Sequence, residues 1–213
     1  MPKVIVIDAG HGGKFPGAPV QTARNSGIKG EEELTLAIAI EMFHILKERG
    51  VIPVLTRWHN NELAQYLPVD LKRRAKIADI AGASVFISLH ANSSQRPIDT
   101  AEGYEIYHYP DSLEGQRYAE AIMDAYGKAF PAMKSRGIEA EEFEVLRETA
   151  SPAVLFEMFF ANNPEENKWA AEHTKEIAAA ICEGLIEVLA PASPMDINSI
   201  MAVNMKMAKG KFI

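Results

Sequence analysis

Short runs of apolar, mostly β-branched residues alternate along the chain with longer segments whose apolar residues recur at helical spacing. This alternation is typical of βα units built around a mainly parallel sheet. Strands are predicted at residues 4–7, 52–56, 85–90, 104–109 and 152–160. Helices are predicted at residues 31–49, 70–82, 113–130 and 164–189. The predicted fold class is therefore α/β, a single domain with an open, mostly parallel, twisted sheet and helices on both faces.

Local signals support several of these boundaries. The segment 31–49 carries an apolar stripe at helical spacing, and Gly50 follows it as a typical residue just past a helix C-terminus. The segment 163–166, NPEE, has the order of an N-cap, a first-turn proline and a capping-box glutamate, so the last long helix should begin there. The strand 52–56 contains a proline, which lacks a backbone donor, and this favours a place at the edge of the sheet.

The composition matches an ordinary globular protein, with 213 residues, 47% hydrophobic and 24% charged residues and a net charge of −7. This length suits one α/β domain. No apolar run approaches the roughly 20 residues that a spanning helix needs, so no membrane interaction is expected. The acidic balance without a basic run argues against nucleic acid as a partner. Cys182 is the single cysteine, which excludes an intrachain disulfide, and we expect it to be a small buried hydrophobe on a helix.

The two ends of the chain differ from its middle. Residues 1–10 lack the apolar region of a secretory signal, so we expect a protein made without a signal peptide, or an exported one whose signal has been removed. Residues 191–213 hold three lysines, one aspartate, a Ser-Pro-x-Asp helix-start signal and a short apolar stripe. We expect the folded domain to span 1–190 and the tail 191–213 to form a short helix that docks or makes a subunit contact; a linker remnant is the alternative.

Four residues with metal-binding or acid–base side chains are expected at one edge of the sheet. His11, His90 and Glu157 each follow or end a predicted strand. The carboxyl ends of parallel strands meet at one edge, which is where ligands bind in open α/β sheets. Glu31 opens the helix that follows the first strand, and such a helix begins at the edge where its strand ended. The pattern predicts that all four side chains gather there.

Two imidazoles and two carboxylates fit a catalytic zinc site, in which three protein ligands leave a fourth position open. The remaining group would then serve for proton transfer. Glu157 suits this task because its apolar neighbours should raise its pKa toward neutrality. Each residue also has an ordinary interpretation, as a loop residue, a hydrogen-bonded strand end, a helix-terminal glutamate or a capped carboxylate. Those interpretations give no reason for the common edge.

An ordered set of motifs covers nearly the whole of residues 3–189. They are DAGHGGKFPGA (8–18), EEELTLAIA (31–39), VLTR (54–57), RAKIADIAGASVFISLHANSS (74–94), GYEIYHY (103–109), RGI (136–138), VLR (145–147) and PAVLFEMFFANNPEE (152–166). Each motif is weak alone, but the ordered set resembles the zinc-dependent N-acetylmuramoyl-L-alanine amidases of bacterial cell walls and phage endolysins. The resemblance implies hydrolysis of the amide between N-acetylmuramic acid and L-alanine, with peptidoglycan as the partner.

The resemblance also implies residue roles. The zinc ligands are His11, Glu31 and His90, which hold one Zn²⁺, and the catalytic carboxylate is Glu157. Asn92 matches an asparagine of the family that shapes the site as a substrate-binding residue, and a turn residue is the equally good alternative. Counting back from Leu36, which matches the helical leucine of the family, selects Glu31 among the three adjacent glutamates. The other histidines, which are His44, His59, His108 and His173, are expected to be structural or surface residues.

Two departures from the family pattern bear on the biological role. Glu157 is followed by Met-Phe-Phe rather than x-Gly-Phe, which is closer to phage-type members, and no blocking helix is expected before it, so the site should be open. An endolysin held in the host cytoplasm until the membrane is breached is the favoured interpretation, and a trimmed exported enzyme is the alternative. Another zinc hydrolase, such as a carboxypeptidase or deacylase, and an inactive wall-binding module remain as alternative functions.

Overall fold

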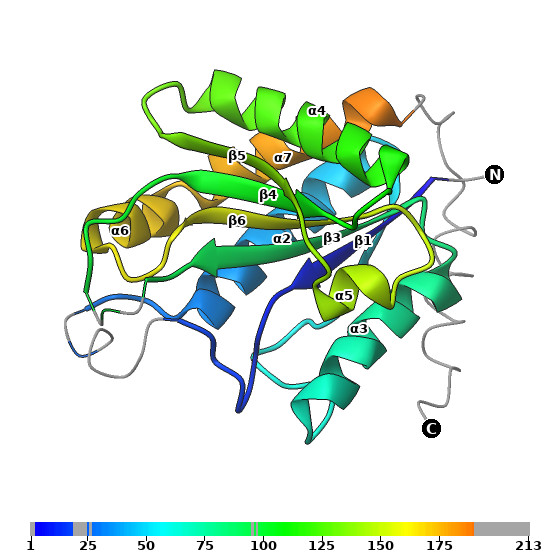
Figure 1. The fold of residues 1–213 in the computed structure, drawn as a ribbon, viewed down its shortest axis with the longest axis horizontal. Helices are drawn as coiled ribbons and strands as arrows, with labels where there is room; N and C mark the ends of the chain where they lie inside the picture. Colours follow the sequence, from blue (N-terminus) through cyan, green and yellow to red (C-terminus); the bar gives the residue numbers. More distant parts are fainter. Residues whose placement is uncertain (1–2, 19–24, 26, 95, 97, 190–213) are drawn as a thin grey trace.

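The computed structural model describes residues 3–18, 25, 27–94, 96 and 98–189, and shows a six-stranded sheet with helices on both faces (Figure 1). The strands are β1 (Val4–Ala9), β2 (Ile52–Leu55), β3 (Val85–Asn92), β4 (Tyr104–His108), β5 (Ser135–Ala140) and β6 (Ala153–Phe160). The helices are α2 (Glu31–Glu48), α3 (Leu67–Ala81), α4 (Leu113–Ala129), α5 (Glu144–Arg147), α6 (Pro164–Glu172) and α7 (Thr174–Val188). The predicted α/β class is confirmed. The predicted tail helix in 191–213 lies outside the described residues.

The strand order is β2-β1-β3-β6-β4-β5. The first four strands in this order run parallel, whereas β4 pairs antiparallel with β6 and parallel with β5. The edge at which β1, β3 and β6 end is therefore also the edge at which β4 and β5 begin. The proline-containing strand β2 lies at one side of the sheet, so the predicted edge position is confirmed.

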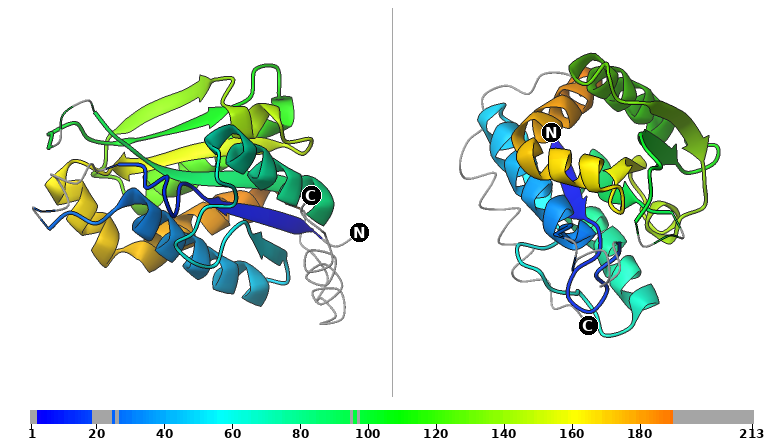
Figure 2. Two further views of the ribbon diagram at one scale, coloured as in Figure 1. Left: turned by 90° about the horizontal axis from the view of Figure 1, so that it is seen from below. Right: turned by 90° about the vertical axis from the view of Figure 1, so that its left-hand side faces the viewer.

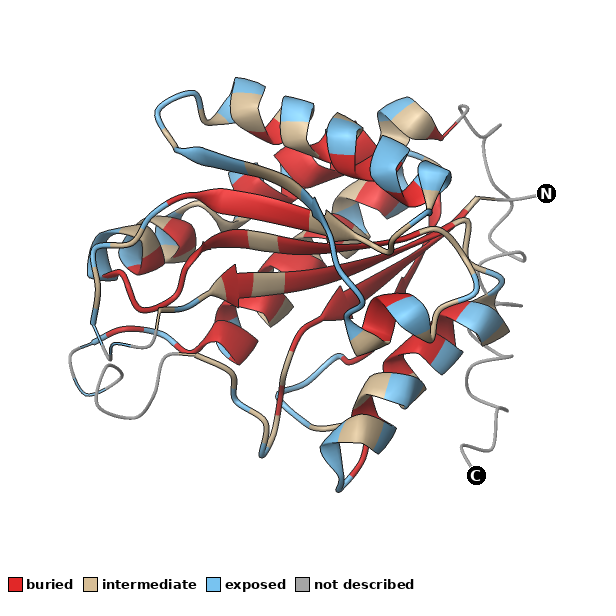
Figure 3. Cartoon of the chain, in the orientation of Figure 1, coloured by how far each residue is buried: buried red, intermediate tan, exposed pale blue. Residues whose placement is uncertain are grey.

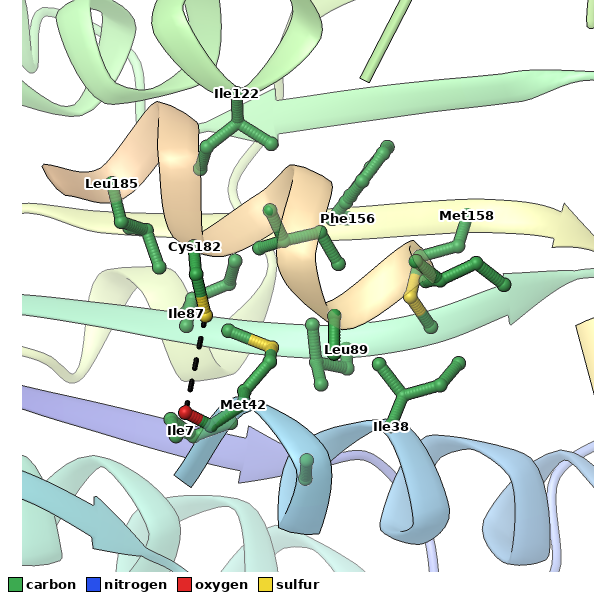
Figure 4. Close-up of a cluster of buried hydrophobic side chains, with 14 of the residues drawn as sticks. Ile7, Ile38, Met42, Ile87, Leu89, Ile122, Phe156, Met158, Cys182 and Leu185 are labelled. Atoms are coloured by element: carbon green, nitrogen blue, oxygen red, sulfur yellow. Dashed lines mark hydrogen bonds between the residues drawn. The ribbon is translucent and has the colours of Figure 1, made fainter. Parts of the chain in front are cut away.

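Helices α2, α4 and α7 pack on one face of the sheet and enclose the larger hydrophobic core. Figure 4 shows Met42 of α2 and Cys182 of α7 meeting Ile87 of β3 in this core. The Cys182 thiol is fully buried, and its Sγ lies 3.9 Å from the carbonyl oxygen of Met42. Cys182 is thus a small buried residue on a helix, as expected.

Helices α3 and α5 lie on the opposite face and enclose a smaller core with Phe86 and Leu155. Figure 2 shows α3 and the layer of α2 and α7 on opposite sides of the sheet. In Figure 1 no helix lies in front of the left-hand part of the sheet, where β3 and β6 end and β4 begins. This uncovered end is the edge at which the sequence predicts the functional residues.

The single helix predicted over 164–189 is wrong, because the chain forms two helices that meet at His173. The His173 Nδ1 lies 2.8 Å from the carbonyl oxygen of Trp169, the acceptor that the backbone N–H of residue 173 would use in a continuous helix. That N–H donates instead to Ala170, which ends α6, and the ring stacks on Trp169. Local side-chain competition for a backbone acceptor is the physical reason for the break.

The segment 131–151 holds the strand β5 and the short helix α5, neither of which the sequence pattern predicts. The sequence of β5, SRGIEA, has almost no apolar alternation because this edge strand is mostly exposed (Figure 3). β5 forms because it pairs with β4, and the β-propensity of its own residues does not predict this pairing. Helix α3 also begins at Leu67 rather than residue 70, with a proline in its first turn.

Candidate active site

The side chains of His11, Glu31, His90 and Glu157 gather at the uncovered edge of the sheet. His90 lies in β3 and pairs in register with Glu157 in β6, and residues paired in this way point to the same face. Glu31 is the first residue of α2, and His11 lies in the loop after β1. The predicted meeting of parallel strand ends is what the structure shows.

Two buried arginines hold the loop that carries His11. Arg57 donates from Nε to the carbonyl oxygen of Ala9 at 2.8 Å and from Nη2 to that of Gly10 at 3.0 Å. Arg74 donates from Nη1 to Ala9 and from Nη2 to the carbonyl oxygen of His11, at 2.8 and 2.7 Å. His11 has a positive φ of 63°, a conformation that costs a non-glycine residue free energy. The arginines fix a loop that would not adopt this shape alone.

Glu31 is oriented by backbone donors on both of its carboxylate oxygens. The Ala18 N–H donates to Oε2 at 2.8 Å, and the Ala91 N–H donates to Oε1 at 3.0 Å. The side chain is almost fully buried. Burial favours the protonated form, but the facing imidazoles of His11 and His90 outweigh it and hold the pKa of Glu31 well below its ordinary value. Glu31 is therefore an ionised carboxylate facing two histidines.

Three donor atoms form a nearly equilateral triangle. The distances from His11 Nε2 to Glu31 Oε1, from His90 Nδ1 to Glu31 Oε1, and from His90 Nδ1 to His11 Nε2 are each 3.1 Å. Ligand atoms of a tetrahedral zinc ion with bonds of about 2.0–2.1 Å lie roughly 3.3 Å apart. The residues present thus fit a divalent metal in donor type and in spacing. This is the one group of its kind within the described ranges.

A hydrogen-bond chain behind His90 sets which ring nitrogen faces the cluster. The Ser88 hydroxyl donates to Asp8 Oδ2 at 2.7 Å, so its oxygen is left to accept from His90 Nε2 at 3.1 Å. With a metal bound, this arrangement would place the proton on Nε2 and leave the lone pair of Nδ1 for the ion. Burial lowers the pKa of His90, which keeps the ring neutral as a metal ligand requires.

Glu157 is the second carboxylate of the site, and its environment differs from that of Glu31. Its Oε2 is a buried oxygen without a hydrogen-bond partner among the described residues. Burial, and then the negative charges of Glu31 and Glu105, raise the pKa of Glu157 well above its ordinary value. Two neighbouring carboxyl groups whose pKa values are pushed apart are the usual basis for separate acid and base roles.

Asn92 lies beyond the metal-binding cluster and contacts a residue that the sequence did not single out. Its Nδ2 donates to Oε1 of Glu105, the second residue of β4. The other oxygen of Glu105 accepts from Arg136 Nε of β5 at 2.9 Å. Glu105 pairs in register with Glu157, so both point to the same face. In the sequence, Glu105 is one polar residue of a strand in which polar and apolar residues alternate. It lies beside Glu157 only because β4 runs antiparallel to β6.

The sequence pattern also did not predict the charged residues that support the cluster. Arg74, Asp8 and Asp70 form a buried network, in which Arg74 Nη1 lies 2.9 Å from Asp8 Oδ1 and Nε lies 2.7 Å from Asp70 Oδ1. The i, i+4 spacing of Asp70 and Arg74 was a visible signal, but it is equally typical of an exposed helical pair.

A cavity of about 190 Å³ adjoins the cluster on the side of α3. Its lining combines apolar side chains with titratable ones, which are Phe15, Leu67, Leu71, His11, His90, Asp8, Asp70 and Arg74. Apolar side chains therefore lie next to the polar groups of the metal-binding edge.

Comparison with known proteins shows what the whole chain is similar to. A family model described as N-acetylmuramoyl-L-alanine amidase matches residues 5–187. The endolysin of Bacillus phage SPP1 is 33% identical over 198 residues, which is 89% of this chain and 67% of that protein. The probable cell wall amidase LytH of Staphylococcus aureus is 31% identical over 86% of this chain, and the match spans 57% of the length of LytH.

Solved structures give the same picture. The catalytic domain of CwlV, an N-acetylmuramoyl-L-alanine amidase from Bacillus (Paenibacillus) polymyxa var. colistinus, has a TM-score of 0.78 and 34% identity, over 89% of this chain and 99% of that one. An N-acetylmuramoyl-L-alanine amidase from Clostridium difficile 630 has a TM-score of 0.78 and 27% identity, over 88% and 97%.

Proposed function

Because this chain belongs to the N-acetylmuramoyl-L-alanine amidase family, we propose that His11, Glu31 and His90 hold a single Zn²⁺ and that Glu157 is the catalytic carboxylate. The chain is a peptidoglycan amidase, and the bond cleaved joins N-acetylmuramic acid to L-alanine. The observation that carries the residue assignment is the 3.1 Å triangle of donor atoms beside a buried carboxyl group.

A bound Zn²⁺ supplies Lewis acidity, which polarises the scissile carbonyl and lowers the pKa of the attacking water. The protein supplies the geometry. Ser88 holds His90 with Nδ1 toward the cluster, and the Ala18 and Ala91 amides hold both oxygens of Glu31. These hydrogen bonds orient the ligand atoms, and such support would keep a bound ion in one position.

Glu157 moves the proton. Its Oε2 has no competing hydrogen bond among the described residues, so it is free to accept the proton of the attacking water. The surroundings that raise its pKa favour uptake of that proton, and the resulting carboxylic acid would then donate it to the leaving amine of L-alanine. Glu31 has the opposite environment and stays ionised, so the two carboxylates do not exchange roles.

The experiment is product analysis on purified peptidoglycan with the zinc-loaded protein. An amidase frees the amino group of L-alanine and generates no new reducing sugar ends. Release of terminal amino acids would instead indicate a carboxypeptidase, and binding without any product would indicate an inactive wall-binding module.

We also propose an endolysin role, with residues 1–190 as the catalytic domain. The match to the endolysin of phage SPP1 supports it, at an identity close to that of the LytH match. Expression in a bacterial host with and without a membrane-permeabilising agent tests this role. Lysis only after permeabilisation supports it, whereas lysis or wall turnover without the agent supports an exported enzyme.

A further inference from the structure

A row of polar side chains crosses the uncovered face of the sheet, from the metal-binding cluster to the edge strand β5. His90 pairs in register with Glu157, and Glu157 pairs in register with Glu105. The pairing of β4 with β5 then shifts by one residue, and Arg136 is the extra residue at this irregularity. Bulges of this kind redirect a side chain, often next to an active site. Here the side chain of Arg136 reaches Glu105 and so ends the row.

Glu105 and its neighbours fix the orientation of the Arg136 guanidinium group. Glu105 uses one oxygen to accept from Asn92 and the other to accept from Arg136 Nε at 2.9 Å. The guanidinium carbon also lies 5.1 Å from the centre of the Phe160 ring, within the range of a cation–π contact. The side chain of Glu105 is 11% exposed, whereas that of Arg136 is 35% exposed. The contacts with Glu105 and Phe160 therefore fix the guanidinium group, while part of the Arg136 side chain stays exposed to solvent.

The two terminal nitrogens of Arg136 are its open side. The ion pair with Glu105 uses Nε, and the Arg136 side chain has no other hydrogen bond to the described part of the chain. A guanidinium group with Nη1 and Nη2 free presents a planar fork that matches the two oxygens of a carboxylate. Beyond the metal-binding cluster, Arg136 is the one cationic side chain of this row among the described residues, so an anionic group of a substrate on that side would bind there.

We propose that Arg136 binds a free carboxylate of the stem peptide and so determines which stem peptides the enzyme prefers. This inference rests on the proposed amidase function. Strand β5 lies two strand spacings from β6, roughly 10 Å from the scissile bond beside Glu157. An extended peptide covers roughly 3.3 Å per residue, so a carboxylate on the second or third stem residue reaches the fork. The stem then runs from Glu157 toward β5, across the strands.

The test uses two disaccharide pentapeptides that differ only at the second stem residue, which carries a free α-carboxylate in one and a carboxamide in the other. The wild-type protein should cleave the carboxylate form with a kcat/KM about 10- to 100-fold higher, the range expected for hydrogen bonds to a charged group. Arg136→Gln should lose most of this preference, because KM for the carboxylate form should rise by much more than any change in kcat/KM for the carboxamide form. Arg136→Lys should recover only part of the preference, because an ammonium group lacks the fork.

Two controls separate the possible failures. Arg117→Gln removes an exposed arginine of α4, on the opposite face of the sheet, and should leave both substrates unaffected. Calorimetric titration of both muropeptides into Glu157→Ala should show the same preference in binding without turnover. Equal loss on both substrates, or no loss, in Arg136→Gln overturns the inference and leaves the amidase function standing. If the zinc-loaded wild type cleaves neither substrate, the proposed function falls and the inference falls with it.

Discussion

At the scale of single residues, the candidate site separates two carboxylates by their surroundings. Glu31 has hydrogen-bond donors on both oxygens and faces two imidazoles, which stabilise its charge. Glu157 has a buried oxygen with no partner among the described residues and two negative neighbours, which destabilise its charge. The same side-chain type is thereby suited to hold a cation in one place and to carry a proton in the other.

Replacement of Glu157 by glutamine should abolish proton transfer and leave the metal site intact. We expect kcat to fall by at least about 100-fold, because general acid–base catalysis contributes on that scale. Zinc affinity, measured by competition with a chelating dye, should stay within about twofold of the wild type. The variant should be no less stable, since it removes a carboxyl group that burial disfavours. Near-normal turnover would exclude Glu157 as the catalytic carboxylate.

A glycine close to the cluster offers a second test with a matched control. A Cβ at Gly17 would lie 2.4 Å from Glu31 Oε2 and 2.6 Å from the His11 ring. Gly17→Ala should therefore displace two proposed ligands and weaken zinc binding by at least about tenfold. Gly82 has the same φ of 66° but nothing within 4 Å of its Cβ position. Gly82→Ala should show the backbone cost alone, about 1 kcal/mol of stability, with unchanged zinc affinity.

At the scale of elements, the site depends on a buried network that joins β1 to α3. Arg74 on α3 contacts Asp8 at the end of β1 and the carbonyl oxygens of the loop that follows. The same Asp8 accepts from Thr56 after β2 and from Ser88 on β3. One carboxylate thereby ties together three neighbouring strand ends and the helix above them, which fixes the positions of His11 and His90.

Asp8→Asn should lower the free energy of unfolding at pH 7 by about 3 kcal/mol, since it leaves the buried Arg74 charge without full compensation. Burial alone would raise the pKa of Asp8, but Arg74, Thr56 and Ser88 outweigh it and hold the pKa below 3.8. The stabilisation is therefore present above pH 3.8 and is lost as the pH falls toward the folded-state pKa.

Urea unfolding of both proteins between pH 2 and pH 7 measures this dependence. The difference in free energy between the wild type and Asp8→Asn should be constant near neutrality and shrink below about pH 4. A difference that stays constant down to the lowest pH would show that the Asp8 charge does not stabilise the fold. An exposed pair, removed by Glu114→Gln, should give a change below about 1 kcal/mol.

At the scale of the whole molecule, the sheet leaves one end of one face uncovered. Helices α2, α4 and α7 pack on the other face, whereas α3 and α5 cover only part of this one. The uncovered end holds the cluster, Glu157 and the polar row to Arg136, so an extended polymer has access across several strands. Helices long and apolar enough to cross a lipid bilayer do not occur in the described ranges.

Metal removal should lower the stability of the whole domain, because the proposed ligands come from β3, α2 and the loop after β1. Zinc at about 100 times its dissociation constant stabilises the folded state by about 2.7 kcal/mol. For a protein of this size that raises Tm by roughly 5–10 °C. Chelation should lower Tm by this amount and stop wall lysis, and added Zn²⁺ should restore both.

The zinc-dependent change of Tm also identifies the ligands. Glu157→Gln should retain it, and His90→Ala should lose it. A shift that survives in His90→Ala would place the metal elsewhere, and a shift absent from the wild type would exclude a structural contribution of the ion.

The sequence alone determined the alternation of strands and helices, because burial on both faces of a parallel sheet requires long apolar runs that stand out from their surroundings. It also determined that His11, His90, Glu31 and Glu157 belong to one edge, because parallel strands end together. The strand β5 and the helix break at His173 depended on a strand pairing and on a side-chain contact.

Only the tertiary structure decided the rest of the site. Glu105 and Arg136 reach the edge because β4 and β5 run opposite to β6, a choice of direction that no local pattern encodes. The burial of the Asp8 and Arg74 charges could not be predicted from either residue alone, since the two compensate each other across 66 residues of sequence. The periodicity of apolar residues indicates which residues are buried. The direction of a strand and the partner of a buried charge depend on packing between segments that are distant in the sequence.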